Sequence, residues 1–179
     1  MANISLLVGS AGAGSPTSEV HSSQGETLGQ LAVDSSGNIY MYVDFQEAFV
    51  AGEWAVVDHT YKAFQLSNTL AGYVGVVVGT VSASDRFGWI QVYGVHTAAW
   101  GTSDVTSGQP LIVAATTDLG HVAPMTTTAG VAVFGAIARS APDTCASTAL
   151  STSALAAPFT VQLNFPYVSR QLGDQTSAP

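Results

Sequence analysis

Short valine-rich runs separated by glycine-containing turns are the feature that most constrains the fold of this chain. The clearest run, 72–81, is nearly all apolar, and its β-branched side chains and short length favour a buried strand over a helix. Similar runs occur at 53–57 and 88–95. Helix-favouring Lys, Glu, Arg and Leu are scarce, whereas 18 glycines supply turns and bulges. The sequence therefore predicts an all-β fold, a small β-barrel or β-sandwich with an extended N-terminal arm.

Two hairpins are expected from turn chemistry. Runs 27–33 and 39–43 flank the segment Asp34-Ser-Ser-Gly-Asn38, which has the composition of a hairpin turn. A second hairpin is expected between 110–114 and 121–123. In 39–43 aliphatic residues alternate with tyrosines, which predicts one aliphatic face and one aromatic face for that strand.

Three regions are predicted along the chain. Residues 1–24 form a flexible arm, 25–168 a β domain with a loop insertion at 142–158, and 169–179 a polar tail. The segment 9–16 is rich in Gly and Ser and ends in Pro, so it is expected to act as a tether.

The N-terminal arm has a strand-like pattern before its tether. Ile4, Leu6 and Val8 are apolar and alternate with Ser5 and Leu7. Such a segment can add as a strand to an exposed sheet edge, where backbone hydrogen bonds hold it and pockets receive alternate side chains. Ile4, Leu6 and Val8 are therefore candidate interface residues.

Positive charge is almost missing from this chain. Four Lys and Arg residues stand against 12 Asp and Glu, so the formal net charge is −8. Phosphate backbones need cationic partners, so we expect no nucleic-acid partner. Ion pairs cannot dominate the contacts of such a chain, which leaves apolar packing and backbone hydrogen bonds. This composition suits a β-rich protein within an assembly better than a free enzyme.

Cysteine usage and hydropathy indicate where the protein works. Cys145 is the single cysteine, so no intrachain disulfide is possible, which fits assembly in a reducing cytoplasm. The N-terminus lacks the basic region of a secretory signal. The longest small and apolar run, 129–138, is shorter than the roughly 20 residues of a membrane helix, so no membrane partner is expected.

Candidate catalytic and metal-binding residues are scattered. Asp44 and Glu47 have the proximity of a glycosidase pair, but solvated loop acids are far commoner. Asp34 and its turn offer oxygen ligands for calcium without EF-hand spacing, and turn chemistry is the preferred interpretation. Asp58 and His59 are neighbours in sequence, so on a strand their side chains diverge.

The remaining nucleophiles and histidines give no constellation. The four histidines have no metal-ligand spacing: His21, His59, His96 and His121. Cys145 has no basic neighbour to lower its pKa. We therefore expect no catalytic, cofactor or metal site, and predict that the protein is not an enzyme.

Aromatic residues are numerous for a small β domain, and Trp and Tyr carry much of the energy of interfaces. The candidate interface residues are Tyr40, Tyr42, Trp54, Trp89 and Trp100. Most of the nine Trp and Tyr residues are expected to fill the core, and those on an outward face are candidate anchors for another subunit. A carbohydrate platform is the rival explanation for any exposed aromatic residue.

The order of these elements resembles that of small head decoration (capsid cement) proteins of tailed bacteriophages. The segments that carry the resemblance are 29–43, 51–57, 75–80, 87–95, 108–111 and the turn at Gly120. The resemblance implies a small β-barrel or sandwich that binds the outside of an assembled capsid, commonly as a trimer. It brings no catalytic residues, and the arm and the insertion at 142–158 depart from the compact versions.

The sequence thus leads to a structural virion protein on the capsid surface, with the major capsid protein as partner and a homotrimer as its own state. The alternative is a phage tail, fibre or head-surface protein that binds carbohydrate. A hydrolase whose residues meet only in space is a third possibility, of a different class.

Overall fold

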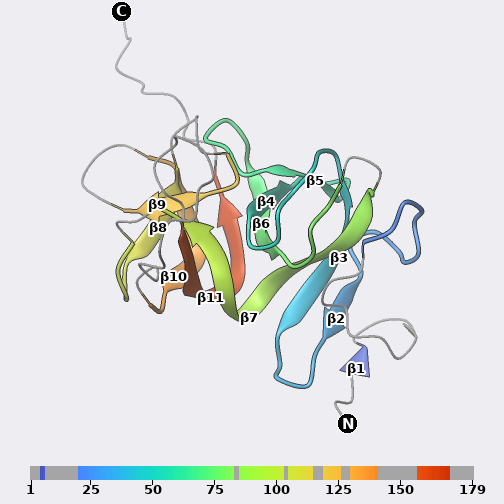
Figure 1. Cartoon of the computed structure of the whole chain (residues 1–179), viewed down its shortest axis with the longest axis horizontal. Helices are drawn as coiled ribbons and strands as arrows, with labels where there is room; N and C mark the ends of the chain where they lie inside the picture. The colour runs from blue at the N-terminus through green and yellow to red at the C-terminus, as the bar shows by residue number, and fades with distance from the viewer. Residues whose placement is uncertain are drawn as a thin grey trace, which may run out of the picture.

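The all-β prediction is confirmed. The computed structural model describes residues 5–6, 20–82, 85–102, 105–114, 119–125, 130–140 and 157–169. Within these ranges the secondary structure is made of strands and turns, with no helix (Figure 1). Eleven strands form one sheet in the order β1-β2-β3-β5-β4-β6-β11-β10-β8-β9-β7.

The strands follow the valine-rich and aromatic runs of the sequence. The first six are β1 (Ser5–Leu6), β2 (Leu31–Val33), β3 (Ile39–Phe45), β4 (Trp54–Val57), β5 (Lys62–Gln65) and β6 (Gly72–Val77). The other five are β7 (Phe87–Gly101), β8 (Pro110–Val113), β9 (Val122–Pro124), β10 (Ala132–Ala138) and β11 (Ala157–Val168).

Strand β7 links the two ends of the molecule. It has 15 residues, and it pairs antiparallel with β3, β6 and β11 and parallel with β9. Figure 1 shows β1–β3 toward one end and β8–β11 toward the other, with β7 running between them. The sheet therefore curls around β7, which brings strands that are distant in sequence into contact.

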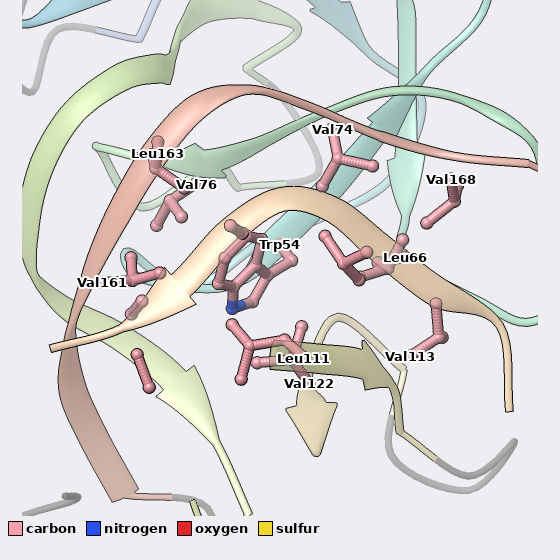
Figure 2. Packing of buried hydrophobic residues seen from close by; sticks show 14 of the residues in the cluster. Trp54, Leu66, Val74, Val76, Leu111, Val113, Val122, Val161, Leu163 and Val168 are labelled. Atoms are coloured by element: carbon pink, nitrogen blue, oxygen red, sulfur yellow. The ribbon is translucent and has the colours of Figure 1, made fainter. Parts of the chain in front are cut away.

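Trp54 occupies the centre of the largest core cluster. Its side chain is completely buried, and its indole Nε1 donates a hydrogen bond to the carbonyl of Trp100 at 2.9 Å. Figure 2 shows it among Val76, Leu111 and Val161, which come from β6, β8 and β11. A second cluster gathers around Val43, Ile90 and Phe45. The buried Trp54 of β4 thus packs against strands β6, β8 and β11.

Both predicted hairpins are present. β2 and β3 pair antiparallel across the Asp34–Asn38 turn, and β8 pairs antiparallel with β9. The expected strand over 72–81 is shorter than predicted, because β6 ends at Val77. Strand β5 had no counterpart in the sequence prediction, and β7 continues to Gly101, beyond the predicted end at 95.

Part of the N-terminal arm lies on a sheet edge, as its pattern predicts. Ser5 and Leu6 pair antiparallel with Val33 and Ala32 of β2 in the same chain. His21 forms an isolated bridge with Phe87, so the described chain joins the domain before residue 25. The following predicted features lie outside the described residues: Ile4, Val8, the tether 9–16, the insertion 142–158 except its last two residues, and the tail from 170.

Gly52 and Gly37 provide a matched test of packing around Trp100. Both have positive φ, 95° and 81°, but a Cβ on Gly52 would lie 2.5 Å from Cδ1 of Trp100, whereas a Cβ on Gly37 meets nothing within 4 Å. We expect Gly37→Ala to cost about 1 kcal/mol of unfolding free energy from strain alone. Gly52→Ala should cost about 3 kcal/mol or more, because overpacking is added. Urea unfolding measures both, and equal losses would contradict this packing.

Candidate functional site

Four of the predicted interface aromatics lie in the interior. Tyr40, Tyr42, Trp54 and Trp89 are all buried, and Trp100 is partly buried. The prediction that they serve as outward anchors is therefore wrong for these four side chains in the folded chain. Trp100 is also engaged within the domain, since its Nε1 donates to the carbonyl of Ala51 at 2.7 Å.

These aromatic side chains of β3 are buried because the chain around Leu28 packs over them. Tyr40 and Tyr42 form a third core cluster with Trp89, and Leu28 packs against it. The rings of Tyr42 and Trp89 meet edge to face with centroids 5.0 Å apart, and the Tyr42 hydroxyl accepts a hydrogen bond from the backbone of Gly25. The side of β3 that carries Tyr40 and Tyr42 is thus covered by the chain that precedes β2, and both sides of this strand are buried.

The exposed aromatics of this structure come from other strands. Seven large apolar side chains, between 38% and 57% exposed, lie on β6, β7, β10 and β11. We call them the aromatic face: Tyr73, Tyr93, Val95, Phe134, Ile137, Phe165 and Tyr167. None of the seven was among the residues predicted as interface candidates.

Strand register brings these side chains together. Phe134, Tyr167 and Tyr73 are cross-strand partners in a row over β10, β11 and β6. The rings of Phe134 and Tyr167 stack with centroids 5.1 Å apart. Because cross-strand partners point to the same side of a sheet, the three rings form one continuous strip.

A second row extends the strip. Ile137 and Val95 are the partners of Gln162 from opposite sides of β11. Tyr93 pairs with Asn164, and its ring lies 5.6 Å from that of Phe165. The aromatic face therefore spans β10, β11 and β7 at mid-strand, with β6 at one end.

A bulge shapes this face. The register between β10 and β11 shifts between Phe134 and Ala136, where Gly135 has φ of 77°. Opposite it, Phe165 adopts φ of 46°, a conformation that is rare for a bulky residue and that is found where surrounding structure enforces it. Three residues of β11, 164–166, lie opposite Gly135, so β11 has two extra residues here; Asn164 and Phe165 are both exposed, which adds a ring to the face.

The aromatic face is also free of charge. The sequences of β7, β10 and β11 contain no Asp, Glu, Lys or Arg, although the chain carries a net charge of −8. Arg139 directly follows β10 and Arg86 directly precedes β7, so these cations lie at strand ends. Monomeric proteins rarely expose large contiguous apolar patches, so this face indicates a site of interaction.

A pocket opens at the end of the aromatic face near β6. It has a volume of about 450 Å³, and its lining includes Tyr73, Tyr167, Asp58 and His59. Asp58 Oδ1 accepts hydrogen bonds from the Thr60 hydroxyl at 2.7 Å and from the backbone N–H groups of Thr60 and Lys62. Burial alone raises the pKa of Asp58, but these hydrogen bonds outweigh it and hold the pKa below its ordinary value. The pocket therefore presents two aromatic rings and one carboxylate.

The two carboxylates considered and set aside as a glycosidase pair both make structural contacts. Asp44 is buried and accepts two hydrogen bonds from Arg86 Nη2, at 3.0 and 2.8 Å. Glu47 Oε1 accepts a hydrogen bond from the backbone of Gln65 at 2.6 Å. Each carboxylate thus holds a neighbouring segment in place.

Asp34 performs turn chemistry, as the sequence predicted. Its Oδ1 accepts hydrogen bonds from the backbone of Ser36 and Asn38, and its Oδ2 accepts from the Asn38 amide and the Tyr40 hydroxyl. Burial raises the pKa of Asp34, but these hydrogen bonds together lower it. Both oxygens are satisfied within the hairpin.

No cluster of three or more His, Cys, Asp or Glu side chains that could hold a metal ion is found in the described ranges, and Cys145 lies outside them. The same ranges contain no helix long and apolar enough to cross a membrane.

His96 is a histidine whose pKa is strongly perturbed by burial. It lies on β7 beside β11, and its Nδ1 is 2.8 Å from Oε1 of Gln91. Gln91 uses its amide nitrogen to donate to the carbonyl of Tyr93, so Nδ1 of a neutral His96 is the donor to Oε1. Burial lowers the pKa of His96 to about 4, which keeps the ring neutral at physiological pH.

This shift predicts a loss of stability in mild acid. The unfolded chain takes up a proton on His96 near pH 6.5, while the folded chain takes it up near pH 4. The stabilisation of the folded chain that comes from keeping His96 neutral is therefore complete above about pH 6.5, and it is lost as the pH falls toward 4. Between about pH 7 and pH 5 we expect a loss of about 2 kcal/mol in unfolding free energy.

Urea unfolding at a series of pH values measures this effect. His96→Gln should flatten the dependence, because the side chain stays neutral at every pH. The same slope in His96→Gln and in the parent chain would contradict the assignment.

Comparison with known proteins gives no relative: no protein-family model, no curated protein and no solved structure matches this chain. The interpretation of its function therefore rests on its residues and their geometry.

Proposed function

We propose that this chain is a structural virion protein, a capsid decoration or cement protein that binds the outside of a phage head and stabilises the shell. Its partners are the major capsid protein and its own copies, as a homotrimer. The observation that carries the proposal is the uncharged aromatic face on an all-β chain of net charge −8.

The chemistry of the described residues favours binding over catalysis. The carboxylates suggested as a catalytic pair, Asp44 and Glu47, hold Arg86 and the backbone of Gln65. A catalytic acid or base needs reach to a substrate proton, and both oxygens of the buried Asp44 are occupied by Arg86. In contrast, the aromatic face offers rings of the kind that dominate the binding energy of interfaces.

The order of elements also supports the proposal. The segments that resemble decoration proteins correspond to β2 and β3, then β4, β6, β7 and the start of β8, followed by the turn at Gly120. These elements are strands of the sheet and one turn between strands. The resemblance therefore concerns the framework of the fold rather than its loops.

Coexpression with the major capsid protein of the same viral genome tests the proposal. We expect this chain to sediment with the assembled shells in a density gradient, in a copy number that scales with the number of capsid subunits. Decorated shells should also withstand a higher temperature before they break. A folded chain that stays at the top of the gradient, with shells of unchanged stability, would contradict the proposal.

A truncated variant tests the role of the arm in the same assay. Because Ser5 and Leu6 add only a short strand at the β2 edge, deletion of residues 2–15 should leave the thermal transition of the free domain nearly unchanged. We expect it to weaken attachment to the shell or to sister subunits. If the truncated chain occupies shells as fully and as durably as the intact chain, the arm has no role in attachment.

The pocket beside Tyr73 favours a second candidate function, that of a carbohydrate-binding protein of a phage tail, fibre or head surface. Sugar sites combine apolar or aromatic walls with a few polar groups that fix orientation, and here Asp58 and His59 supply the polar groups. A glycan array probes this function directly. Specific binding that is lost in Asp58→Asn would support it, and an array without specific signals would reject it.

A further inference from the structure

The aromatic face exposes an area that approaches that of a stable interface. Its seven side chains are each 38% to 57% exposed. Taking about 200 Å² for a large apolar side chain, the exposed part amounts to roughly 600 Å² on one chain. A standard protein interface buries roughly 800 Å² per partner, rim included. One partner of similar size, seated squarely on the face, therefore accounts for nearly all of this exposed area.

The distribution of charge indicates which partner fits the aromatic face. Every copy of this chain carries −8, so two copies repel each other wherever their acidic surfaces approach. Strands β7, β10 and β11 carry no Asp, Glu, Lys or Arg, so two copies can meet across them without opposing carboxylates. A different protein with a basic surface would instead gain most by approaching the acidic parts of this chain.

Other occupants fit the face less well. The described part of the N-terminal arm pairs with β2, which Figure 1 shows at the end of the molecule away from β10 and β11. A glycan needs hydrogen-bonding groups along its length, yet most of the face consists of Phe, Val, Ile and the rings of Tyr. Within the face the amides of Gln162 and Asn164 are polar, and further polar groups that a sugar could use lie in the pocket at one end, around Asp58.

We infer that the aromatic face is the surface through which copies of this chain associate, with the stacked rings of Phe134 and Tyr167 in its interior and Tyr73 at its β6 end. The inference deepens the proposed function, on whose self-association it rests, by naming the face that sister subunits share. It leaves the β1–β2 end of the molecule available for other contacts.

Sedimentation equilibrium of the full chain tests the inference without any shell. We expect a mass of two or three times the 18.3 kDa of one chain at micromolar concentration. A trimer agrees with the proposed function as well, whereas a dimer supports the inference and contradicts the proposed trimer. A monomer would overturn the inference, although binding of single chains to a shell could still hold.

Matched substitutions locate the contact. Ile137 and Val50 are both 50% exposed, but only Ile137 belongs to the aromatic face. Ile137→Asp should weaken association by at least about 30-fold, because it places a carboxylate in the buried contact. Val50→Asp should leave the mass unchanged. Association that is unaffected by Ile137→Asp would overturn the inference.

A second variant guards against effects on folding. Tyr167→Ser removes a ring that is 47% exposed and adds no charge, so the monomer should keep its circular dichroism spectrum and its core. We expect it also to reduce the mass toward that of one chain. A folded Tyr167→Ser variant that associates like the parent chain would overturn the inference.

Salt provides an independent readout. Raising NaCl from about 0.01 M to about 1 M shortens the screening length from about 30 Å to about 3 Å. Association through an uncharged face should strengthen, because the repulsion between two chains of −8 is screened while the apolar contact remains. Dissociation at high salt would indicate an interface of ion pairs and overturn the inference.

Discussion

The pairing of β7 with strands from both ends of the sheet is the interaction on which the rest of the structure depends. Its first half bonds to β3 and β6, and its second half bonds to β11. It contributes Trp89, Ile90 and Ala99 to three different core clusters. With one ion pair recorded in the described ranges, between Arg86 and Asp44, backbone hydrogen bonds and apolar packing hold these clusters together. The scarcity of charge is therefore compatible with a stable domain, because burial supplies most of the stabilisation.

The sequence predicted the fold class and most strands, since valine-rich runs and turn residues act locally. It missed β5, whose Lys-Ala-Phe-Gln sequence is short and half polar, and the second half of β7, where His96 to Gly101 shows no strong β pattern. These strands exist because neighbours pair with them. Partner strands of this kind are set by the tertiary fold and leave little trace in a local pattern.

Tyr40 and Tyr42 of β3 show what the alternation of side chains along a strand cannot predict. Alternation correctly places Tyr40 and Tyr42 on one face and Met41 and Val43 on the other, but it does not tell whether the second face meets water. Here the chain around Leu28 covers it. The aromatic face was missed for the converse reason, because residues as distant as Tyr73 and Tyr167 become neighbours only through register. The available sequence indication was the lack of charge throughout 132–138 and 157–168, next to Phe165 and Tyr167.

The protein combines an eleven-stranded sheet with an uncharged surface whose aromatic rings are not covered by other parts of the described chain. Hydroxyl-radical footprinting read by mass spectrometry tests this claim most directly, because it reports the solvent exposure of single side chains in the free and the assembled protein. We expect Tyr73, Tyr93, Phe134 and Tyr167 to be modified in the dilute single chain and protected in the assembled form, while the exposed Tyr61, off the aromatic face, reacts in both. Equal modification of the four rings in both states would contradict the account.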